Sequence, residues 1–75
     1  MKQIVNGVLY DTERDHRIRE MEYSSLYKTP KDQYYLYDEY KESFEPIDRI
    51  SAFNWLQRGY DDDICRIEFP ELYLL

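Results

Sequence analysis

The sequence predicts a small α+β domain in which an antiparallel sheet of two hairpins is packed by one main C-terminal helix. An Asn6-Gly7 pair between two apolar runs predicts the first hairpin, and a turn at Pro30 between tyrosine-rich segments predicts the second. Apolar residues at near-helical spacing predict the helix over about 48–58, with a short helix or strand after it. Because a length of 75 residues fits one domain, we expect residues 1–75 to fold as a single unit.

The first hairpin is predicted over residues 2–10. Asn6 and Gly7 suit a type I′ turn, because both central positions of that turn need positive φ. In the resulting register Ile4 faces Leu9, and apolar side chains lie on both faces of the ribbon. We therefore expect this hairpin to pack against another part of the domain.

The segment after the first hairpin has two possible secondary structures, a helical turn followed by a strand or a longer helix. Thr12, with Asp15 three residues later, predicts a capped single turn of helix. Residues 17–23 then alternate weakly, which favours a strand. A helix over residues 12–22 is the competing interpretation, since Glu, Arg and Met are good helix formers.

The central hairpin carries the tyrosine-rich part of the sequence. Pro30 presets φ for the first corner of a type I turn, and Asp32 tolerates the left-handed conformation that a three-residue loop then needs. This loop places Tyr27 opposite Tyr35, and the alternation of side chains puts Tyr37 on the same face. One face of this hairpin should cover the core, and the other should show hydroxyl-tipped rings to solvent or to a partner.

The C-terminal part is predicted to begin with a polar connector over residues 41–46. Asp48 is the expected N-cap of the main helix, and Gly59 its left-handed C-terminal cap. Residues 62–68 favour a second short helix, with Ile64, Ile67 and Glu68 on one side, although a strand fits nearly as well. The expected buried stripe of the main helix consists of Ile47, Ile50, Phe53, Leu56 and Tyr60, with Ala52 and Trp55 beside it.

The net charge of −6 is unevenly distributed along the chain. Residues 1–31 hold six basic and five acidic side chains, whereas residues 32–75 hold four basic and eleven acidic ones and so carry −7. This balance disfavours direct binding to a nucleic-acid backbone, which needs Lys and Arg to displace counterions. It suits a partner protein with a basic surface.

The candidate partner-binding residues combine tyrosines of the central hairpin with carboxylates of the acidic part. They are Tyr27, Tyr35, Tyr37, Asp38, Glu39, Glu42, Glu45, Asp61, Asp62 and Asp63. Tyrosine is enriched at the hot spots of protein interfaces, whereas aromatic platforms that stack bases lie in positively charged grooves. At least half of the tyrosines are expected simply to fill the core.

The sequence shows no constellation of reactive groups. Nothing in the spacing pairs His16, the only histidine, with Cys65, the only cysteine, as a base and a nucleophile. Asp61–Asp63 lacks the alternating ligands and the glycine of a calcium-binding loop, and an acidic helix start explains it better. We therefore expect a protein that is not an enzyme, with no catalytic residue, no metal and no cofactor.

Composition also indicates the cellular setting. A single cysteine cannot form an internal disulfide, and the chain has no apolar run long enough to span a membrane. Both observations predict a cytoplasmic protein without membrane attachment. An aromatic sheet face on so small a domain could also pair with a second copy, so a homodimer is a further expectation.

Three fragments resemble small, mostly uncharacterised proteins of phages and mobile elements in Gram-positive bacteria. They are NGVLYDTE at 6–13, LYKT followed by YYLY within 26–37, and Ala52 with Trp55-Leu56. Such proteins show a "GKxYDTE" hairpin exit, an "LYxTxxGxYFLY" hairpin and an "AxxWL" helix. This chain departs from that pattern at Asp32-Gln33, where the hairpin glycine would stand.

The resemblance implies a role in host takeover or in countering host defences, as for anti-CRISPR-like inhibitors. On this view the protein would bind a basic surface of a host bacterial protein, such as one in a nucleic-acid-binding complex, and inhibit or modulate it by mimicking nucleic-acid charge. The alternative is a nucleic-acid-binding or transcription-regulating accessory module. Its basic residues would be Arg14, Arg17, Arg19, Lys28 and Lys31.

Overall fold

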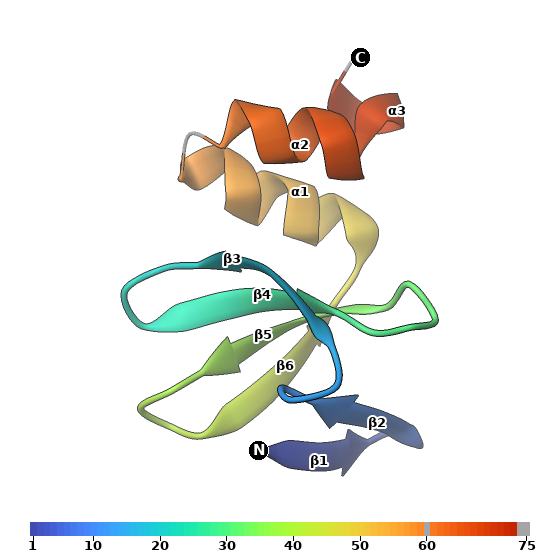
Figure 1. The fold of residues 1–75 in the computed structure, drawn as a ribbon, viewed down its shortest axis with the longest axis vertical. Coiled ribbons are helices and arrows are strands. Elements are labelled where there is room, and N and C mark those ends of the chain that lie inside the picture. Colours follow the sequence, from blue (N-terminus) through green and yellow to red (C-terminus); the bar gives the residue numbers. More distant parts are fainter. Residues whose placement is uncertain (60, 74–75) are drawn as a thin grey trace.

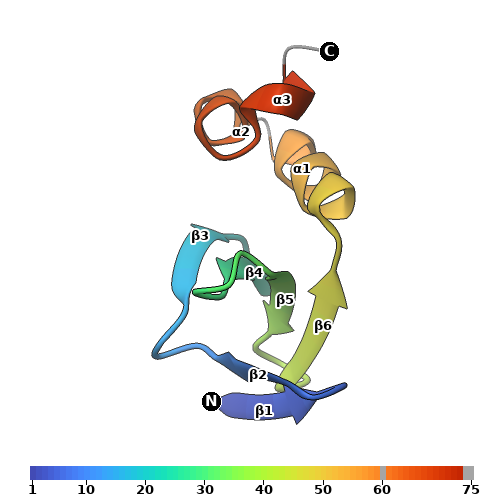
Figure 2. The same ribbon diagram turned by 90° about the vertical axis from the view of Figure 1, so that its right-hand side faces the viewer.

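A computed structural model describes residues 1–59 and 61–73 and arranges them in three layers. A two-stranded N-terminal hairpin lies on one side of a four-stranded antiparallel sheet, and helices lie on the other (Figures 1 and 2). This is the predicted α+β class. The strands are β1 (Lys2–Val5), β2 (Val8–Asp11), β3 (His16–Glu20), β4 (Ser24–Lys28), β5 (Tyr34–Asp38) and β6 (Ser43–Ile47); the helices are α1 (Arg49–Arg58), α2 (Asp62–Glu68) and α3 (Pro70–Tyr73).

The N-terminal hairpin has the predicted register. Ile4 faces Leu9 across β1 and β2. Asn6 and Gly7 adopt φ values of 51° and 80°, as a type I′ turn requires. The backbone N–H of Thr12 donates to the carbonyl of Met1 at 2.9 Å and closes the open end of the hairpin. Two strands alone are marginally stable, so the hairpin depends on the sheet beneath it.

The central hairpin, β4 and β5, also pairs as predicted. Tyr27 lies opposite Tyr35, and Asp32 adopts the left-handed conformation with φ 61°. The Thr29 hydroxyl accepts hydrogen bonds from the backbone N–H groups of Lys31 at 3.3 Å and Gln33 at 3.2 Å. These bonds satisfy backbone donors of the turn and hold its shape.

The segment after β2 contains one turn and then β3, so the strand is confirmed over the competing helix at 12–22. The cap residue differs from the prediction, because Asp11 rather than Thr12 receives the capping bond. The Asp11 carboxylate accepts from the backbone N–H of Glu13 at 3.0 Å, and Asp15 accepts from the N–H of Asp11 at 2.9 Å.

The predicted polar connector over 41–46 is wrong, because residues 43–47 form the edge strand β6. Its alternation is hard to recognise in the sequence, since Phe44 is its one buried residue and Pro46 normally argues against a strand. An edge strand tolerates proline because one side of it needs no hydrogen-bond donor.

The main helix α1 starts as predicted, and part of the predicted stripe is buried: Leu56 lies in the core, with Ile47 and Phe53 partly buried against it. The Asp48 carboxylate accepts from the backbone N–H of Ser51 at 2.7 Å, which confirms the N-cap. Ala52 and Leu56 are fully buried, whereas Ile50, predicted in the stripe, is 60% exposed. A small alanine at the contact lets the helix approach its neighbours closely, which a stripe based on residue size does not anticipate.

Two further details at the helices differ from the prediction. Gly59 has φ −90° rather than a left-handed value. A Cβ there would lie 2.3 Å from the Met21 Cε atom, so the glycine provides space instead. The helix predicted at 62–68 is confirmed, but it buries Cys65 while Ile67 is 78% exposed. Tyr60 lies outside the described residues.

Two separate cores follow from the three layers. The helix core lies between the sheet and the helices and consists of Leu26, Tyr34, Ala52, Leu56, Cys65 and Phe69. The hairpin core lies between the sheet and the N-terminal hairpin and consists of Tyr10, Tyr27, Tyr35, Tyr37 and Phe44, with Val5 and Val8 against them. Both faces of the sheet are therefore covered (Figure 2).

Candidate functional site

The predicted tyrosine face is buried rather than exposed. Tyr27, Tyr35 and Tyr37 are 7%, 0% and 9% exposed, because the β1–β2 hairpin covers this side of the sheet. The rings of Tyr27 and Tyr35 stack at 5.2 Å with an interplanar angle of 6°. In this fold the three rings therefore belong to a core of the domain rather than to an exposed face.

A buried carboxylate ties this core together. Asp15 accepts from the Tyr35 hydroxyl at 2.9 Å and from the Arg14 Nε at 2.7 Å, in addition to the Asp11 amide. Burial alone would raise the pKa of Asp15, but these hydrogen bonds outweigh it and lower that pKa below its usual value. Burial, followed by the Asp15 charge, raises the pKa of Tyr35. This network is structural, since it lies beneath the hairpin.

Two other tyrosines are exposed where two strand turns meet. Tyr23, after β3, and Tyr40, after β5, are 53% and 76% exposed, and their ring centres lie 5.1 Å apart. The backbone N–H of Glu39 donates to the Tyr23 carbonyl at 3.3 Å and joins the two turns. The sequence prediction missed this pair. The register of the central hairpin could have revealed this pair. Asp38 pairs with Ser24 at the end of the β4–β5 ladder, so Tyr23 and Tyr40 both lie just beyond that end.

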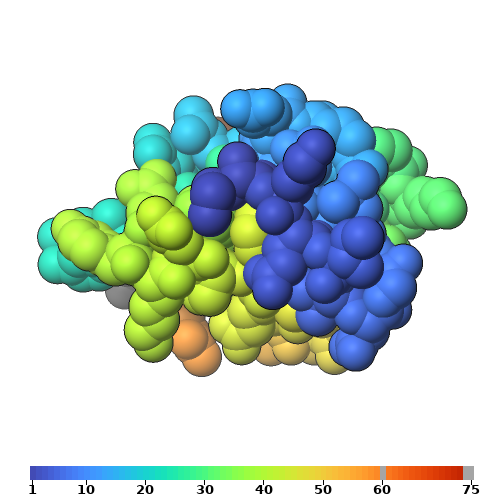
Figure 3. All heavy atoms as spheres, turned by 90° about the horizontal axis from the view of Figure 1, so that it is seen from below, coloured from blue at the N-terminus to red at the C-terminus, as the bar shows by residue number. Residues whose placement is uncertain are grey.

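The end of α1 and the start of α2 lie on the same side of the molecule as these strand turns. Figure 1 shows the end of α1, the start of α2 and the β3–β4 and β5–β6 turns along the left side, and Figure 3 shows the two strand turns at one edge. Arg19 on β3 contacts Asp61 at 2.5 Å, which fixes the helical turn to the sheet. We call this region the acidic end; it comprises Tyr23 and Tyr40 with Glu22, Asp38, Glu39, Glu42, Asp61, Asp62 and Asp63.

The structure divides the predicted carboxylates into internal and available groups. Asp38 accepts from the backbone N–H groups of Tyr40 at 2.9 Å and Lys41 at 3.0 Å and so shapes its own turn. Asp61 is paired with Arg19, and Asp63 with Arg66 at 2.7 Å. Within the described part of the chain, the carboxylates of this end that form neither a salt bridge nor a side-chain hydrogen bond are Glu22, Glu39, Glu42 and Asp62.

Glu45 does not belong to this group. It lies in the middle of β6, opposite Leu36, where it lines a shallow cleft with Arg58 and Trp55.

The negative potential of the acidic end also reaches Tyr37 in the neighbouring hairpin core. Burial, followed by the charges of Glu42 and Glu39, raises the pKa of Tyr37.

The basic residues of the alternative function are mostly neutralised by carboxylates. Arg17 lies 3.7 Å from Glu20, and Lys28 lies 2.8 Å from Glu68. Arg14 and Arg19 contact Asp15 and Asp61, as described above. Of the five basic residues of that interpretation, Lys31 is the one without a salt bridge in residues 1–59 and 61–73. This arrangement weakens the case for contacts with a phosphate backbone.

The candidate reactive groups take up separate, ordinary positions. Cys65 is fully buried, and burial, followed by the charges of Asp62 and Asp61, raises the pKa of its thiol. His16 is exposed at the start of β3. Among the described residues, no three His, Cys, Asp or Glu side chains converge as a metal site would require.

Comparison with known proteins yields no relative. No protein family, no curated protein and no solved structure matches this chain. Within the described residues, no helix has both the length and the apolar character needed to cross a membrane. The surface of this molecule is therefore the basis for inferring its function.

Proposed function

We propose that the protein is a non-enzymatic binding module that attaches through its acidic end to a basic surface of another protein and thereby inhibits or modulates it. The observation that carries the proposal is the exposed Tyr23–Tyr40 pair beside carboxylates that form no salt bridge in the described chain. Exposed rings of this size gain contact area at low entropic cost, which makes them candidate hot spots.

The distribution of charge supports a basic partner. Three turns bring carboxylates to one end of a protein with a net charge of −6. A surface of one sign steers an oppositely charged partner and suppresses association with acidic ones. Carboxylates held by separate turns can also imitate a row of phosphates. A bacterial protein that handles nucleic acid is therefore the proposed class of target, in line with the phage-protein resemblance.

The decisive experiment is capture of the partner from a bacterial lysate by the tagged protein, with and without nuclease. We expect the same bound protein in both samples, with retention that decreases between on the order of 0.05 M and 0.5 M salt. Recovery that requires intact nucleic acid would favour the accessory module instead. Retention that is insensitive to salt would contradict charge mimicry.

Variants assign the binding to the acidic end. Glu39→Gln with Glu42→Gln should weaken capture, and Tyr40→Ala should weaken it by about tenfold if the ring is a hot spot. The matched control is Glu13→Gln with Asp32→Asn, which removes two exposed carboxylates from other turns. Equal effects of both double variants would show that net charge, rather than this surface, determines binding.

A further inference from the structure

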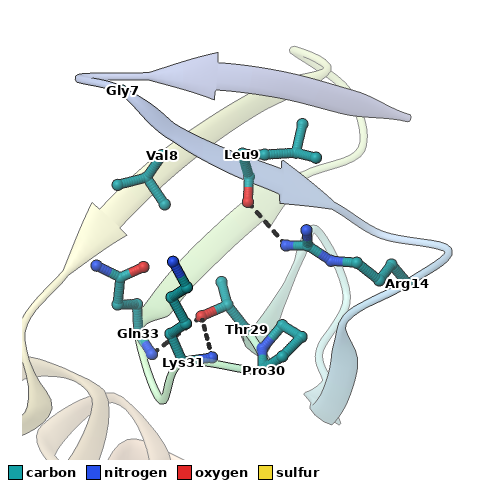
Figure 4. A pocket seen from close by; sticks show the side chains of 8 residues that line it. All are labelled: Gly7, Val8, Leu9, Arg14, Thr29, Pro30, Lys31 and Gln33. Carbon is teal, nitrogen blue, oxygen red and sulfur yellow. Dashed lines mark hydrogen bonds between the residues drawn. The ribbon is translucent and has the colours of Figure 1, made fainter.

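The strongest unassigned feature is a cleft between the N-terminal hairpin and the β4–β5 turn. It has a volume of about 350 Å³ and lies between Gly7 and Val8 on one side and Thr29 and Pro30 on the other (Figure 4). Figures 1 and 3 place these segments away from the acidic end. A volume in this range accommodates a small molecule.

Basic side chains line the cleft: Lys31 has no salt bridge in the described residues, whereas the charge of Arg14 is paired with Asp15. Its lining residues include Arg14 and Lys31 and no Asp or Glu, although acidic residues outnumber basic ones by sixteen to ten in the chain. Figure 4 shows the Lys31 ammonium and the Gln33 carboxamide directed into the space below β2. Such donors suit an anion.

Hydrogen bonds hold the side chain of Arg14 and the backbone of the turn that carries Lys31 and Gln33. Arg14 Nη2 donates to the Leu9 carbonyl at 2.8 Å and Nε to Asp15, so the guanidinium has a fixed direction. Its Nη1 makes no hydrogen bond within residues 1–59 and 61–73. The Thr29 hydroxyl fixes the backbone of Lys31 and Gln33. A donor whose direction is already fixed, as in Arg14, loses little entropy when it binds a ligand.

We propose that this cleft binds a small ligand with one oxyanion group, a carboxylate or a phosphate, attached to a short apolar body. Lys31 and the Arg14 Nη1 would contact the oxyanion, and the Gln33 carboxamide would donate beside them. The side chains of Val8 and Pro30 supply apolar surface for the rest of the ligand. This site is independent of the acidic end and of the function proposed for it.

Amide chemical shifts measured during titration test the site with defined probes. Isovalerate has the carboxylate and the apolar body, isovaleramide lacks the charge, and inorganic phosphate has the oxyanion alone. We expect saturable shifts at Val8, Lys31 and Gln33 with isovalerate and none with isovaleramide. Saturation by phosphate alone would assign the site to phosphate ligands. Shifts that do not saturate with either anion would overturn the proposal.

A matched pair of lysine variants separates the cleft from general charge. Lys31→Gln should weaken binding of the saturating anion by about tenfold, because a charged hydrogen bond is lost. Lys41→Gln removes one exposed lysine from the β5–β6 turn and should leave affinity unchanged. Equal losses in the two variants, or no loss in Lys31→Gln, would show that the anion does not bind in this cleft.

Discussion

The two cores on opposite faces of the sheet are closed in different ways. The helix core is covered by α1 and α2, which contribute the small residues Ala52 and Cys65, and by one large ring, Phe69, directly after α2. The hairpin core is covered only by two four-residue strands. It compensates with five aromatic rings, each of which buries about 150–250 Å². Large rings thus allow a thin layer to close a core.

The two cores also differ in where their polar groups lie. Around the helix core they lie at its rim, where Arg49 donates to the Tyr34 hydroxyl at 2.8 Å and Lys28 contacts Glu68. Burial, followed by the charge of Glu68, raises the pKa of Tyr34 to about 12. In the hairpin core the carboxylate of Asp15 is itself inside. The free energy of unfolding should therefore be most sensitive to lost side-chain volume in the helix core and to a lost charge in the hairpin core.

The largest effect is expected from removing volume in the helix core. Phe69 is fully buried, and its ring centre lies 5.3 Å from that of Tyr34 and 5.9 Å from that of Phe53. The Arg49 Cζ atom lies 4.8 Å from the same ring centre. Phe69→Ala should lower the free energy of unfolding by about 3–5 kcal/mol, measured by urea denaturation. A loss below about 1 kcal/mol would show that the helices contribute little to this core.

A smaller effect, dependent on pH, is expected from the charge in the hairpin core. Because the pKa of Asp15 is lower in the folded protein, its stabilisation is present above the unfolded pKa of about 3.9 and lost as pH falls through the folded value. Asp15→Asn should cost about 2 kcal/mol at neutral pH and reduce the loss of stability in acid.

Urea denaturation of the Asp15→Asn variant at several pH values between neutral and acid tests this expectation. Some acid dependence should remain, since the pKa values of Asp48 and Glu71 are also lowered by their hydrogen bonds to Ser51 and Arg49. An unchanged acid dependence in the variant would contradict a stabilising role for the Asp15 charge.

Removing one hydroxyl distinguishes the contribution of hydrogen bonding to the stability of the hairpin core from that of ring packing. Tyr35→Phe keeps the stacked ring but removes a donor to Asp15, and should cost about 1–2 kcal/mol in thermal or urea unfolding. Tyr27→Phe is the matched control in the other ring of the stack, and no hydrogen bond of its hydroxyl is found in the described residues. Equal costs would assign the effect to packing alone.

The sequence predicted local structure better than the roles of side chains. Turn chemistry at Asn6-Gly7 and Pro30 determined both hairpins and their registers, because few residues adopt those conformations. The sequence could not tell which face of the central hairpin is exposed, because apolar and aromatic residues alternate on both. That outcome depends on where the first hairpin packs, which is a contact between segments distant in the chain.

The candidate site shows the same limit. Its acidic turns at Asp38–Glu42 and Asp61–Asp63 were predicted, since charge is visible in composition, whereas its rings were assigned to Tyr27, Tyr35 and Tyr37. Two exposed tyrosines, Tyr23 and Tyr40, take that place instead. They come from turns 17 residues apart in the chain, and only the sheet brings them together.

The smallest effect on stability is expected where neither core is touched. Glu39→Gln with Glu42→Gln should change the free energy of unfolding by less than about 0.5 kcal/mol, because both side chains are exposed and form no salt bridge in the described residues. The double variant should nevertheless lower the raised pKa of Tyr37, measured from its ring signals by NMR, since these charges add to the effect of burial. A loss above about 1 kcal/mol would mean that these carboxylates hold the fold, which leaves fewer groups for a partner.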